Sequence, residues 1–271
     1  MISLYLSIII PILLIVAAHS YSVSPSASPS HTISSRKAFL TNTITASLAI
    51  LGTSPSYPAL ADDPDEIIDC YFGMGCFWHI QHEFVVGEIQ LLKRKEEDLT
   101  ARAGYAGGSK AGSGGRVCYH NLAMKDEYGK LGHCEVVNLK IPKSSFSSFC
   151  DIYFSLFDQN GDRPDQRGDR GLEYRSVVGI PGGEKSDLYP LLLAAADKSP
   201  VNVLVGKGND PDAPRNTYVM DNKKFPFYLG ELYHQFHDGF ARGEDYPASY
   251  NNIKNNLEAA GKLDDTSCPF V

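Results

Sequence analysis

The amino-acid sequence predicts an α+β fold, a two-layer sandwich in which helices pack against a mixed sheet. Between residues 70 and 206, short apolar runs typical of strands alternate with longer segments whose apolar residues recur every three or four positions. This alternation indicates a sheet covered by helices. We find no internal repeat, and the pattern therefore describes a single domain.

The first two elements follow one another directly along the chain. Residues 70–73 form a short apolar run ended by glycine, which predicts a strand. Residues 76–87 predict a helix, because their apolar side chains fall at intervals of three and four, and Gly87 supplies a stop. A glycine-rich passage over residues 104–120 then predicts a long loop that carries binding residues.

The later elements continue the alternation. Residues 133–142 predict a strand, and residues 144–157 predict a helix capped by Ser144 or Ser145, with Cys150 on its apolar face. The remaining elements are a strand at 177–180, a helix at 185–199, a strand at 201–206 and a polar helix at 251–262. The last residues, 264–271, predict a mobile tail that carries Cys268.

Residues 1–61 predict a cleaved, bipartite targeting leader, which leaves residues 62–271 as the mature domain. The leader contains no Asp or Glu, and its two apolar stretches, ending at Ala18 and Gly52, are too short for confident membrane spans. The second stretch is followed by Ala59-Leu60-Ala61, a cleavage signature. Two signals in series resemble the targeting of proteins to a plastid, with the thylakoid lumen as a candidate compartment. Secretion is the alternative.

Charge and cysteine spacing limit the function of the mature chain. Removing Arg36 and Lys37 with the leader changes the formal net charge from −7 to −9, which argues against a nucleic-acid-binding protein. Nothing outside the leader suggests a membrane segment. The six cysteines show no Cys-x-x-Cys spacing, and the mature chain is long enough to fold without disulfides.

Cys76 is the first candidate for chemistry. At the first turn of a helix, unpaired backbone N–H groups and the positive end of the helix dipole favour the thiolate. The alternative is a small buried residue, which is the common fate of a free cysteine. Phe77 and Trp78 favour the reactive interpretation, since two adjacent large rings at a helix start cannot both face the core.

Five short blocks carry a resemblance to a known family. "FGMGCFW", "GYAGG", "GHCEVV", "GDRGLEYRS" and "ELYHQ" occur in this order between Cys70 and Gln235. Together they resemble the A-type peptide-methionine sulfoxide reductases, which act on the S epimer of the sulfoxide. The resemblance implies a ferredoxin-like sheet and an enzyme of protein repair under oxidative stress.

The resemblance also implies a role for each matching residue. Cys76 would attack the sulfoxide sulfur, and Glu135 would be the acid that protonates the departing oxygen. Asp169 and Tyr174 would form hydrogen bonds with the sulfoxide oxygen. Phe77 and Trp78 would contact the methyl group of the substrate. A second active-site tyrosine is expected in the glycine-rich passage, where Tyr119 and Tyr128 are both candidates.

The same resemblance implies recycling through a disulfide. Attack would leave a sulfenic acid on Cys76, a second cysteine would convert it to a disulfide, and thioredoxin would reduce that disulfide. Cys268 is the first candidate for the resolving cysteine and Cys118 the second. Cys134 is expected to point away from the site if Glu135 points into it. The expected substrates are oxidised proteins and free methionine S-sulfoxide, handled by a monomer without a bound cofactor.

Some residues depart from the family pattern and leave alternatives open. His79, Gln81 and Glu173 stand where the family usually has other residues. A non-enzymatic binder of oxidised or Met-rich peptides is therefore one alternative. A cysteine hydrolase, with His133 or His234 activating Cys76, is another. The H-x-x-H-E order from His79 is not a zinc-protease pattern, so no metal is expected there.

Overall fold

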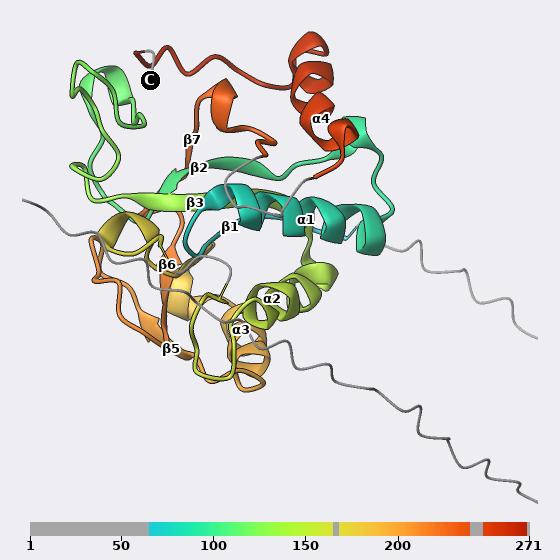
Figure 1. The fold of residues 1–271 in the computed structure, drawn as a ribbon. Coiled ribbons are helices and arrows are strands. Elements are labelled where there is room, and N and C mark those ends of the chain that lie inside the picture. Colours follow the sequence, from blue (N-terminus) through green and yellow to red (C-terminus); the bar gives the residue numbers. More distant parts are fainter. Residues whose placement is uncertain (1–64, 165–167, 239–245, 270–271) are drawn as a thin grey trace, which may run out of the picture. The chain divides into compact units, whose positions relative to one another are not determined.

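The computed structural model describes residues 65–164, 168–238 and 246–269, so the predicted leader lies outside the described residues. The described residues belong to one compact unit, Ala59–Val271. Its first six regular elements are β1 (Ile67–Gly73), α1 (Phe77–Leu92), β2 (Arg102–Ala106), β3 (Cys134–Pro142), α2 (Phe146–Ser155) and β4 (Val177–Ile180). Figure 1 shows α1 and α2 lying over the sheet.

These six elements form a ferredoxin-like unit. Their strands lie side by side in the order β4-β1-β3-β2, and each neighbouring pair is antiparallel. A β-α-β-β-α-β chain order with this strand order is the split βαβ arrangement. The ferredoxin-like sheet expected from the sequence is therefore confirmed.

Three further strands widen the sheet at its two edges. β5 (Asn202–Val205) and β6 (Asn216–Asp221) extend it beyond β4, and both of the new pairs, β4 with β6 and β6 with β5, are parallel. β7 (Tyr228–Leu229) adds an antiparallel pair beyond β2. The seven-stranded sheet is therefore mixed, and with its packed helices it confirms the α+β class.

The core lies mainly on the helix side of the sheet. Successive strand residues face opposite sides, so Phe72 and Val137 pack with the helices while Tyr71 and Val136 join a smaller apolar cluster on the other face. Cys70 and Cys150 are fully buried on the helix side, and for Cys150 the sequence predicted this from its place on an apolar helix face.

The predicted end of the first helix at Gly87 is wrong. α1 continues to Leu92, because Gly87 is a point of close approach between helices rather than a stop. A Cβ on Gly87 would lie 2.7 Å from Cδ1 of Ile152 in α2. Glycine here lets α1 and α2 pack closely, and that advantage outweighs its low helix propensity.

The glycine-rich passage is not a loop throughout. Residues 102–106 form β2, and Gly104 permits its pairing with β7, since a Cβ there would lie 2.2 Å from the carbonyl oxygen of Tyr228. β6 and β7 were not expected from the sequence. Ser145 does stand at the N-cap position of α2, but its side chain makes no capping hydrogen bond.

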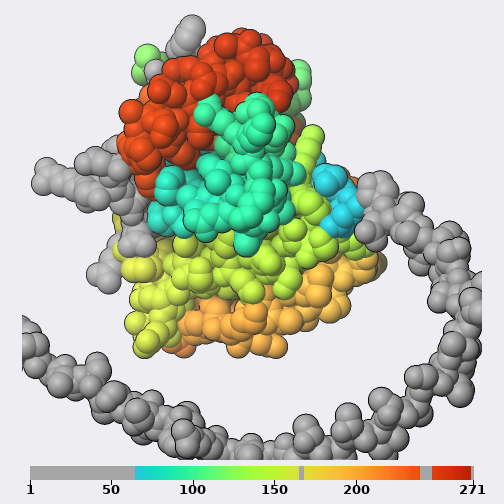
Figure 2. Space-filling view, turned by 90° about the vertical axis from the view of Figure 1, so that its right-hand side faces the viewer, coloured from blue at the N-terminus to red at the C-terminus, as the bar shows by residue number. Residues whose placement is uncertain are grey.

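Two helices complete the described fold. α3 (Tyr189–Ala196) is shorter than the predicted 185–199 and follows a 3-10 turn, and α4 (Ala248–Ala259) matches the predicted polar helix. Figure 2 shows α4 in red beside the segment that follows α1. There Asn256 and Lys262 donate hydrogen bonds to Glu96 and to the carbonyl of Glu97. None of the helices in the described ranges combines the length and apolar character needed to cross a membrane.

Candidate active site

Two glycines shape the corner where β1 turns into α1. A Cβ on Gly73 would lie 2.5 Å from the carbonyl oxygen of Glu135, so only glycine allows the end of β1 to lie this close to β3. Gly75 has a φ of +65°, a backbone conformation that favours glycine. Cys76 follows as the N-cap residue of α1 and is half-buried. The corner therefore presents Cys76 at the positive end of the helix.

Glu135 lies across from this helix start, on β3. Its side chain is 2% exposed, and its Oε2 accepts a hydrogen bond from the backbone N–H of Phe77 at 3.0 Å. The hydroxyl of Tyr128 donates to the other carboxyl oxygen at 3.3 Å. Burial raises the pKa of Glu135 to about 8, despite these two hydrogen bonds. The carboxyl group is therefore mostly protonated at neutral pH and can donate a proton.

The pKa of Cys76 moves in the direction opposite to our expectation. The backbone N–H groups of Trp78 and His79 do favour the thiolate, as the helix start predicted. Burial of the sulfur, followed by the charge of Glu135, outweighs them and raises the pKa of Cys76 well above its usual value. Because protonation of Glu135 removes its negative charge, the protonated acid makes the thiolate easier to form.

Asp169 and Tyr174 lie in the segment that faces this corner. The N–H of Gly75 donates to the carbonyl oxygen of Tyr174 at 3.0 Å, which ties the segment to the β1–α1 turn. The charge of Asp169 raises the pKa of both Cys76 and Glu135, so Asp169 lies near both. Buried Arg163 holds the segment in place by donating to the Asp169 carbonyl at 3.0 Å and to Asp212 at 3.0 Å.

Aromatic rings surround the corner. Phe77 is buried and Trp78 is half-buried, with their ring centres 6.3 Å apart. The ring of His234 packs against both, with its centre 5.2 Å from that of Phe77 and 5.8 Å from that of Trp78. His237 is half-exposed, and its ring centre lies 4.0 Å from that of Trp78. Trp78 is thus the more exposed ring of the predicted pair.

Both candidate tyrosines reach the site, in different ways. Tyr128 is fully buried, hydrogen-bonded to Glu135 and stacked on Tyr105 with ring centres 4.6 Å apart. Tyr119 is half-buried and also stacks on Tyr128, with ring centres 5.8 Å apart. The charge on Cys76 raises the pKa of Tyr119, so its ring lies near the sulfur. Tyr128 can therefore orient the acid, and Tyr119 can contact a substrate.

The two candidate resolving cysteines are bonded to each other. Cys118 and Cys268 form a disulfide that ties the glycine-rich passage to the C-terminal segment. Cys76 is not part of this disulfide. Cys134 belongs to the cluster on the opposite face of the sheet from the helices, which confirms that it points away from the site.

Three residues of the site were given no role from the sequence: Gln81 was noted only as a departure from the family pattern, and Glu231 and Gln235 lie in the "ELYHQ" block. Glu231 accepts hydrogen bonds from the backbone N–H of Tyr119 at 2.8 Å and the hydroxyl of Tyr105 at 2.6 Å. The amide of Gln235 bonds to both backbone groups of Ala103 in β2. Gln81 bonds to Gln235 and to the N–H of Phe236. This buried network fixes the loop that carries His234.

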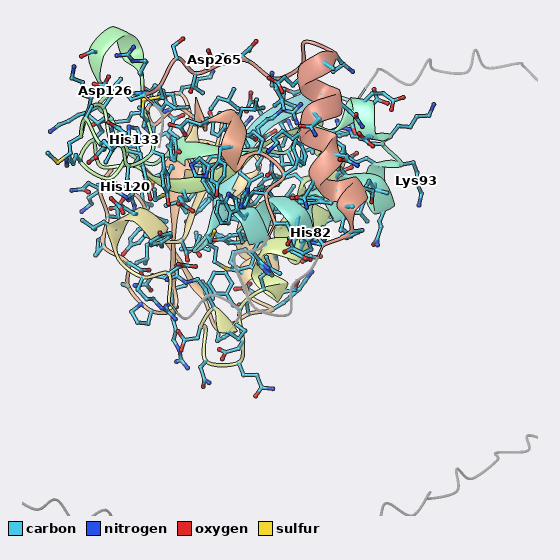
Figure 3. All side chains as sticks on the ribbon, turned by 45° about the horizontal axis from the view of Figure 1, so that its top comes forward. His82, Lys93, His120, Asp126, His133 and Asp265 are labelled. Carbon is cyan, nitrogen blue, oxygen red and sulfur yellow. A yellow bond between two sulfur atoms is a disulfide. The ribbon has the colours of Figure 1, made fainter. Side chains whose placement is uncertain are left out.

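Neither histidine is suited to act as the base of a hydrolase. Both ring nitrogens of His133 are already engaged, one by the Gly108 N–H and one by the Lys110 carbonyl. His133 lies near the glycine-rich passage together with His120 (Figure 3). Neither nitrogen of His234 has a hydrogen-bond partner among the described residues, and burial lowers its pKa to about 3. A thiolate–imidazolium pair is therefore disfavoured.

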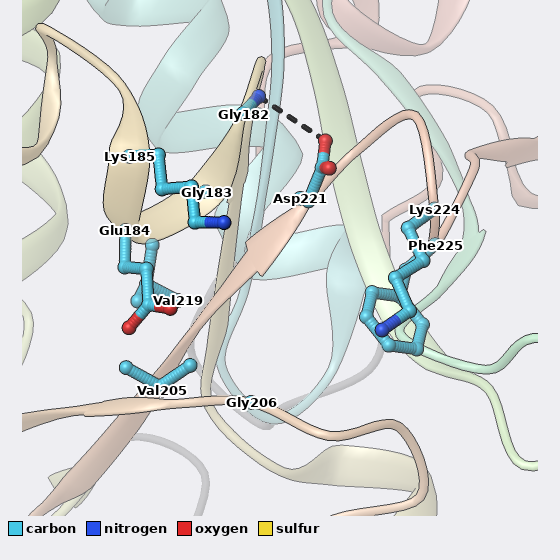
Figure 4. A pocket seen from close by; sticks show the side chains of 10 residues that line it. All are labelled: Gly182, Gly183, Glu184, Lys185, Val205, Gly206, Val219, Asp221, Lys224 and Phe225. Carbon is cyan, nitrogen blue, oxygen red and sulfur yellow. Dashed lines mark hydrogen bonds between the residues drawn. The ribbon is translucent and has the colours of Figure 1, made fainter.

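A separate pocket lies at the ends of the parallel strands. Its volume is about 250 Å³, and its lining includes Gly183, Lys185, Gly206 and Asp221. Figure 4 shows the N–H of Gly182 bonded to the Asp221 carboxylate within it. None of the predicted site residues lines this pocket.

The fold is a ferredoxin-like sheet with packed helices, and its site places a thiol at a helix start with a largely protonated carboxyl group beside it. Residues 68–238 match the profile described as peptide methionine sulfoxide reductase, and the chain belongs to this family of oxidoreductases. The resemblance inferred from the five sequence blocks is thereby confirmed.

Individual relatives bear the A-type name. A peptide methionine sulfoxide reductase MsrA of Geobacter metallireducens is 29% identical over 120 residues, which cover 43% of this chain and 63% of that protein, less than two thirds of its length. The MsrA of Salinispora tropica is 29% identical over 196 residues, which cover 69% of this chain and 72% of that protein.

Solved structures give a weaker likeness. Methionine sulfoxide reductase A of Corynebacterium diphtheriae has a TM-score of 0.41 at 18% identity, covering 69% of this chain and 82% of that one. Reduced Mxr1 from Saccharomyces cerevisiae has a TM-score of 0.40 at 18% identity, and the match covers 68% of this chain and 93% of that one. The family assignment rests on the sequence match and not on these scores.

Proposed function

We propose that the mature protein reduces methionine S-sulfoxide, both in oxidised proteins and as the free amino acid. One observation carries this proposal: Glu135, with a pKa of about 8, lies hydrogen-bonded to the helix start that presents Cys76. A sulfoxide oxygen leaves only when it is protonated, and a carboxyl group that keeps its proton at neutral pH can supply that proton. Family membership supports the same reaction.

In the first step, the sulfur of Cys76 attacks the sulfoxide sulfur while Glu135 protonates its oxygen. The oxygen passes to Cys76 as a sulfenic acid, and the substrate leaves as the thioether. The thiol proton replaces the one that Glu135 gave, so atoms and charge balance. Trp78 would contact the methyl group, and Asp169 and Tyr174 would hold the oxygen. Tyr128, bonded to Glu135, would orient the acid.

In the second step, the two remaining site cysteines act in sequence. Cys118 is held by backbone bonds to Asp126 and Tyr128, whereas Cys268 lies on the C-terminal segment. Cys268 therefore attacks the sulfenic acid first and releases water. Cys118 then attacks Cys268, frees the Cys76 thiol and leaves the Cys118–Cys268 disulfide. The dithiol of thioredoxin reduces that disulfide and returns the monomer to its starting state.

The test uses the mature protein from Asp62 with dithiothreitol and each epimer of a methionine sulfoxide substrate. We expect reduction of the S epimer only, and loss of this activity in Cys76→Ser. Turnover of both epimers, or of neither, would overturn the proposal. Peptide binding without turnover would point to the binding protein considered above, and thiol-dependent cleavage of an ester would point to a hydrolase.

We also propose that residues 1–61 direct the mature domain to a plastid, because the acid-free leader holds two apolar signals in series. A fluorescent protein fused to residues 1–61 should collect inside plastids. Its appearance in the medium would favour secretion instead.

A further inference from the structure

We propose that Cys118, Cys268 and Glu231 form a binding site for a thiophilic divalent cation, Zn²⁺ in particular, when the Cys118–Cys268 disulfide is reduced. The two sulfur atoms and a carboxylate oxygen of Glu231 all lie within 4.8 Å of one another. Ligands around tetrahedral zinc lie about 2.0–2.3 Å from the metal. A small separation of the two sulfurs after reduction would let all three ligand atoms lie at this distance from a single metal ion.

The carboxylate of Glu231 is already oriented as a ligand. One oxygen accepts the backbone N–H of Tyr119 at 2.8 Å, and the other accepts the hydroxyl of Tyr105 at 2.6 Å. Each oxygen keeps a lone pair, because a carboxylate oxygen can accept two bonds. Hydrogen bonds of this kind commonly fix ligating carboxylates in metal sites. Glu231 is half-buried, so its charge is only partly solvated.

The location gives a metal ion access and a place for a fourth ligand. A cleft of about 620 Å³ opens beside Cys268, and Glu231 and Asp265 both line it. Cys118 is buried and Cys268 is half-buried. A water molecule or the Asp265 carboxylate could complete a tetrahedral set. Two thiolates and one carboxylate carry three negative charges, so the site with a divalent cation bound has a net charge of −1.

The metal and the disulfide exclude each other. A dithiol or a phosphine breaks the S–S bond by supplying two electrons, and two protons give the free thiols. Binding of Zn²⁺ then releases both thiol protons, since thiolates are the ligands. While the metal is bound, neither sulfur can attack a sulfenic acid. This last consequence rests on the proposed function, but the binding itself does not.

Cobalt(II) is a direct probe of the site, because thiolate-bound cobalt has a charge-transfer absorption band. Protein reduced with a phosphine should show the band at one equivalent of cobalt, and Zn²⁺ should remove it. Oxidised protein should not show it. Cys118→Ser and Cys268→Ser should each bind at least tenfold more weakly, and Glu231→Gln on the order of tenfold more weakly. Cys76→Ser is the matched control and should keep the band.

A measurement on the unaltered protein guards against misfolded variants. In reduced wild-type protein, Zn²⁺ should slow alkylation of Cys118 and Cys268 by iodoacetamide at least tenfold, as read by peptide mass mapping, and should leave Cys76 alkylation unchanged. Equal rates with and without Zn²⁺ at Cys118 and Cys268 would overturn the proposal. So would a cobalt band that Cys118→Ser and Cys268→Ser both retain. Neither result bears on sulfoxide reduction, so this proposal and the proposed function can fail separately.

Discussion

The backbone N–H of Phe77 donates a hydrogen bond to Oε2 of Glu135 at 3.0 Å. This bond joins the start of α1, which presents Cys76, to the strand that carries the acid. It also sets a balance: burial raises the pKa of Glu135, while the N–H group favours the carboxylate and lowers it. The resulting pKa of about 8 lets the group hold a proton at neutral pH and still release it.

Activity should therefore fall on the alkaline side of about pH 8. Glu135 donates its proton only below its folded-state pKa of about 8, so the rate is highest below that pH and declines above it. Glu135→Gln cannot donate this proton, and we expect kcat to fall by roughly 10²- to 10⁴-fold. The pH profile of kcat with dithiothreitol, measured for both proteins, checks this.

Glu184→Gln is the matched control, because Glu184 lines the separate pocket at the strand ends. It should keep the wild-type profile. An alkaline limb near pH 8 that survives in Glu135→Gln would assign the proton to another group.

Trapped intermediates should show the order in which Cys268 and Cys118 react. After one turnover without reductant, Cys118→Ser should stop as a Cys76–Cys268 disulfide. Cys268→Ser should stop as a sulfenic acid on Cys76 that dimedone labels. Both variants should reduce substrate with dithiothreitol and lose most of their activity with thioredoxin.

Disulfide mapping and intact mass distinguish these species. A Cys76–Cys118 disulfide in Cys268→Ser would show that Cys118 resolves first. Cys150→Ser is the control, since Cys150 is buried in the core away from the disulfide, and it should form the same Cys118–Cys268 bond as wild type.

The sequence predicted those elements that show a clear apolar pattern within their own residues. β1, β3, α2 and β4 have continuous or alternating apolar residues, and the structure has them within a few residues of the predicted bounds. The site residues follow from the blocks in the same way: Cys76 and Glu135 meet because β1 and β3 are neighbours.

The rest depends on contacts between distant segments, which a local pattern does not encode. In the sequence, Gly87 is indistinguishable from a glycine that ends a helix. Only the close approach of α2 explains why α1 continues through it. β2 contains a glycine and β7 has only two residues, so pairing with a neighbour defines both strands. The raised pKa of Cys76 comes from burial and from Glu135, 59 positions away, and local helix position predicts the opposite direction.

Glu88 should be a major determinant of stability. It is fully buried near the end of α1 and accepts hydrogen bonds from the backbone N–H groups of Thr100 and Ala101 at 2.9 and 3.1 Å, as well as from the Arg94 guanidinium. Glu88→Ala would leave these donors and a charge unpaired, so we expect a loss of about 3 kcal/mol in the free energy of unfolding.

Urea denaturation followed by circular dichroism measures this loss. Glu97→Gln, an exposed change in the next turn of chain, should stay within about 0.5 kcal/mol of wild type. Equal midpoints for Glu88→Ala and Glu97→Gln would show that the buried bonds contribute nothing to stability.

Glu173 should tune which sulfoxide substrates are favoured. Its carboxylate lies 3.2 Å from the His120 ring at the rim of the site, and both side chains are partly exposed. Its charge raises the pKa of Glu135, Tyr119 and Tyr128, so the charge is felt inside the site. A carboxylate at the rim attracts a cationic neighbour of the oxidised methionine and repels an anionic one.

We therefore expect kcat/KM to be higher for a peptide with lysine next to methionine S-sulfoxide than for its glutamate counterpart. In Glu173→Gln this ratio should fall by about twofold to fivefold, the size typical of partly exposed charge pairs. The same change removes one cause that raises the pKa of Glu135, so the alkaline limb of kcat should move to lower pH. Because both effects come from a single charge, high salt should weaken the peptide preference in wild type but not in Glu173→Gln. An unchanged ratio, with Glu184→Gln as the control, would remove Glu173 from substrate selection.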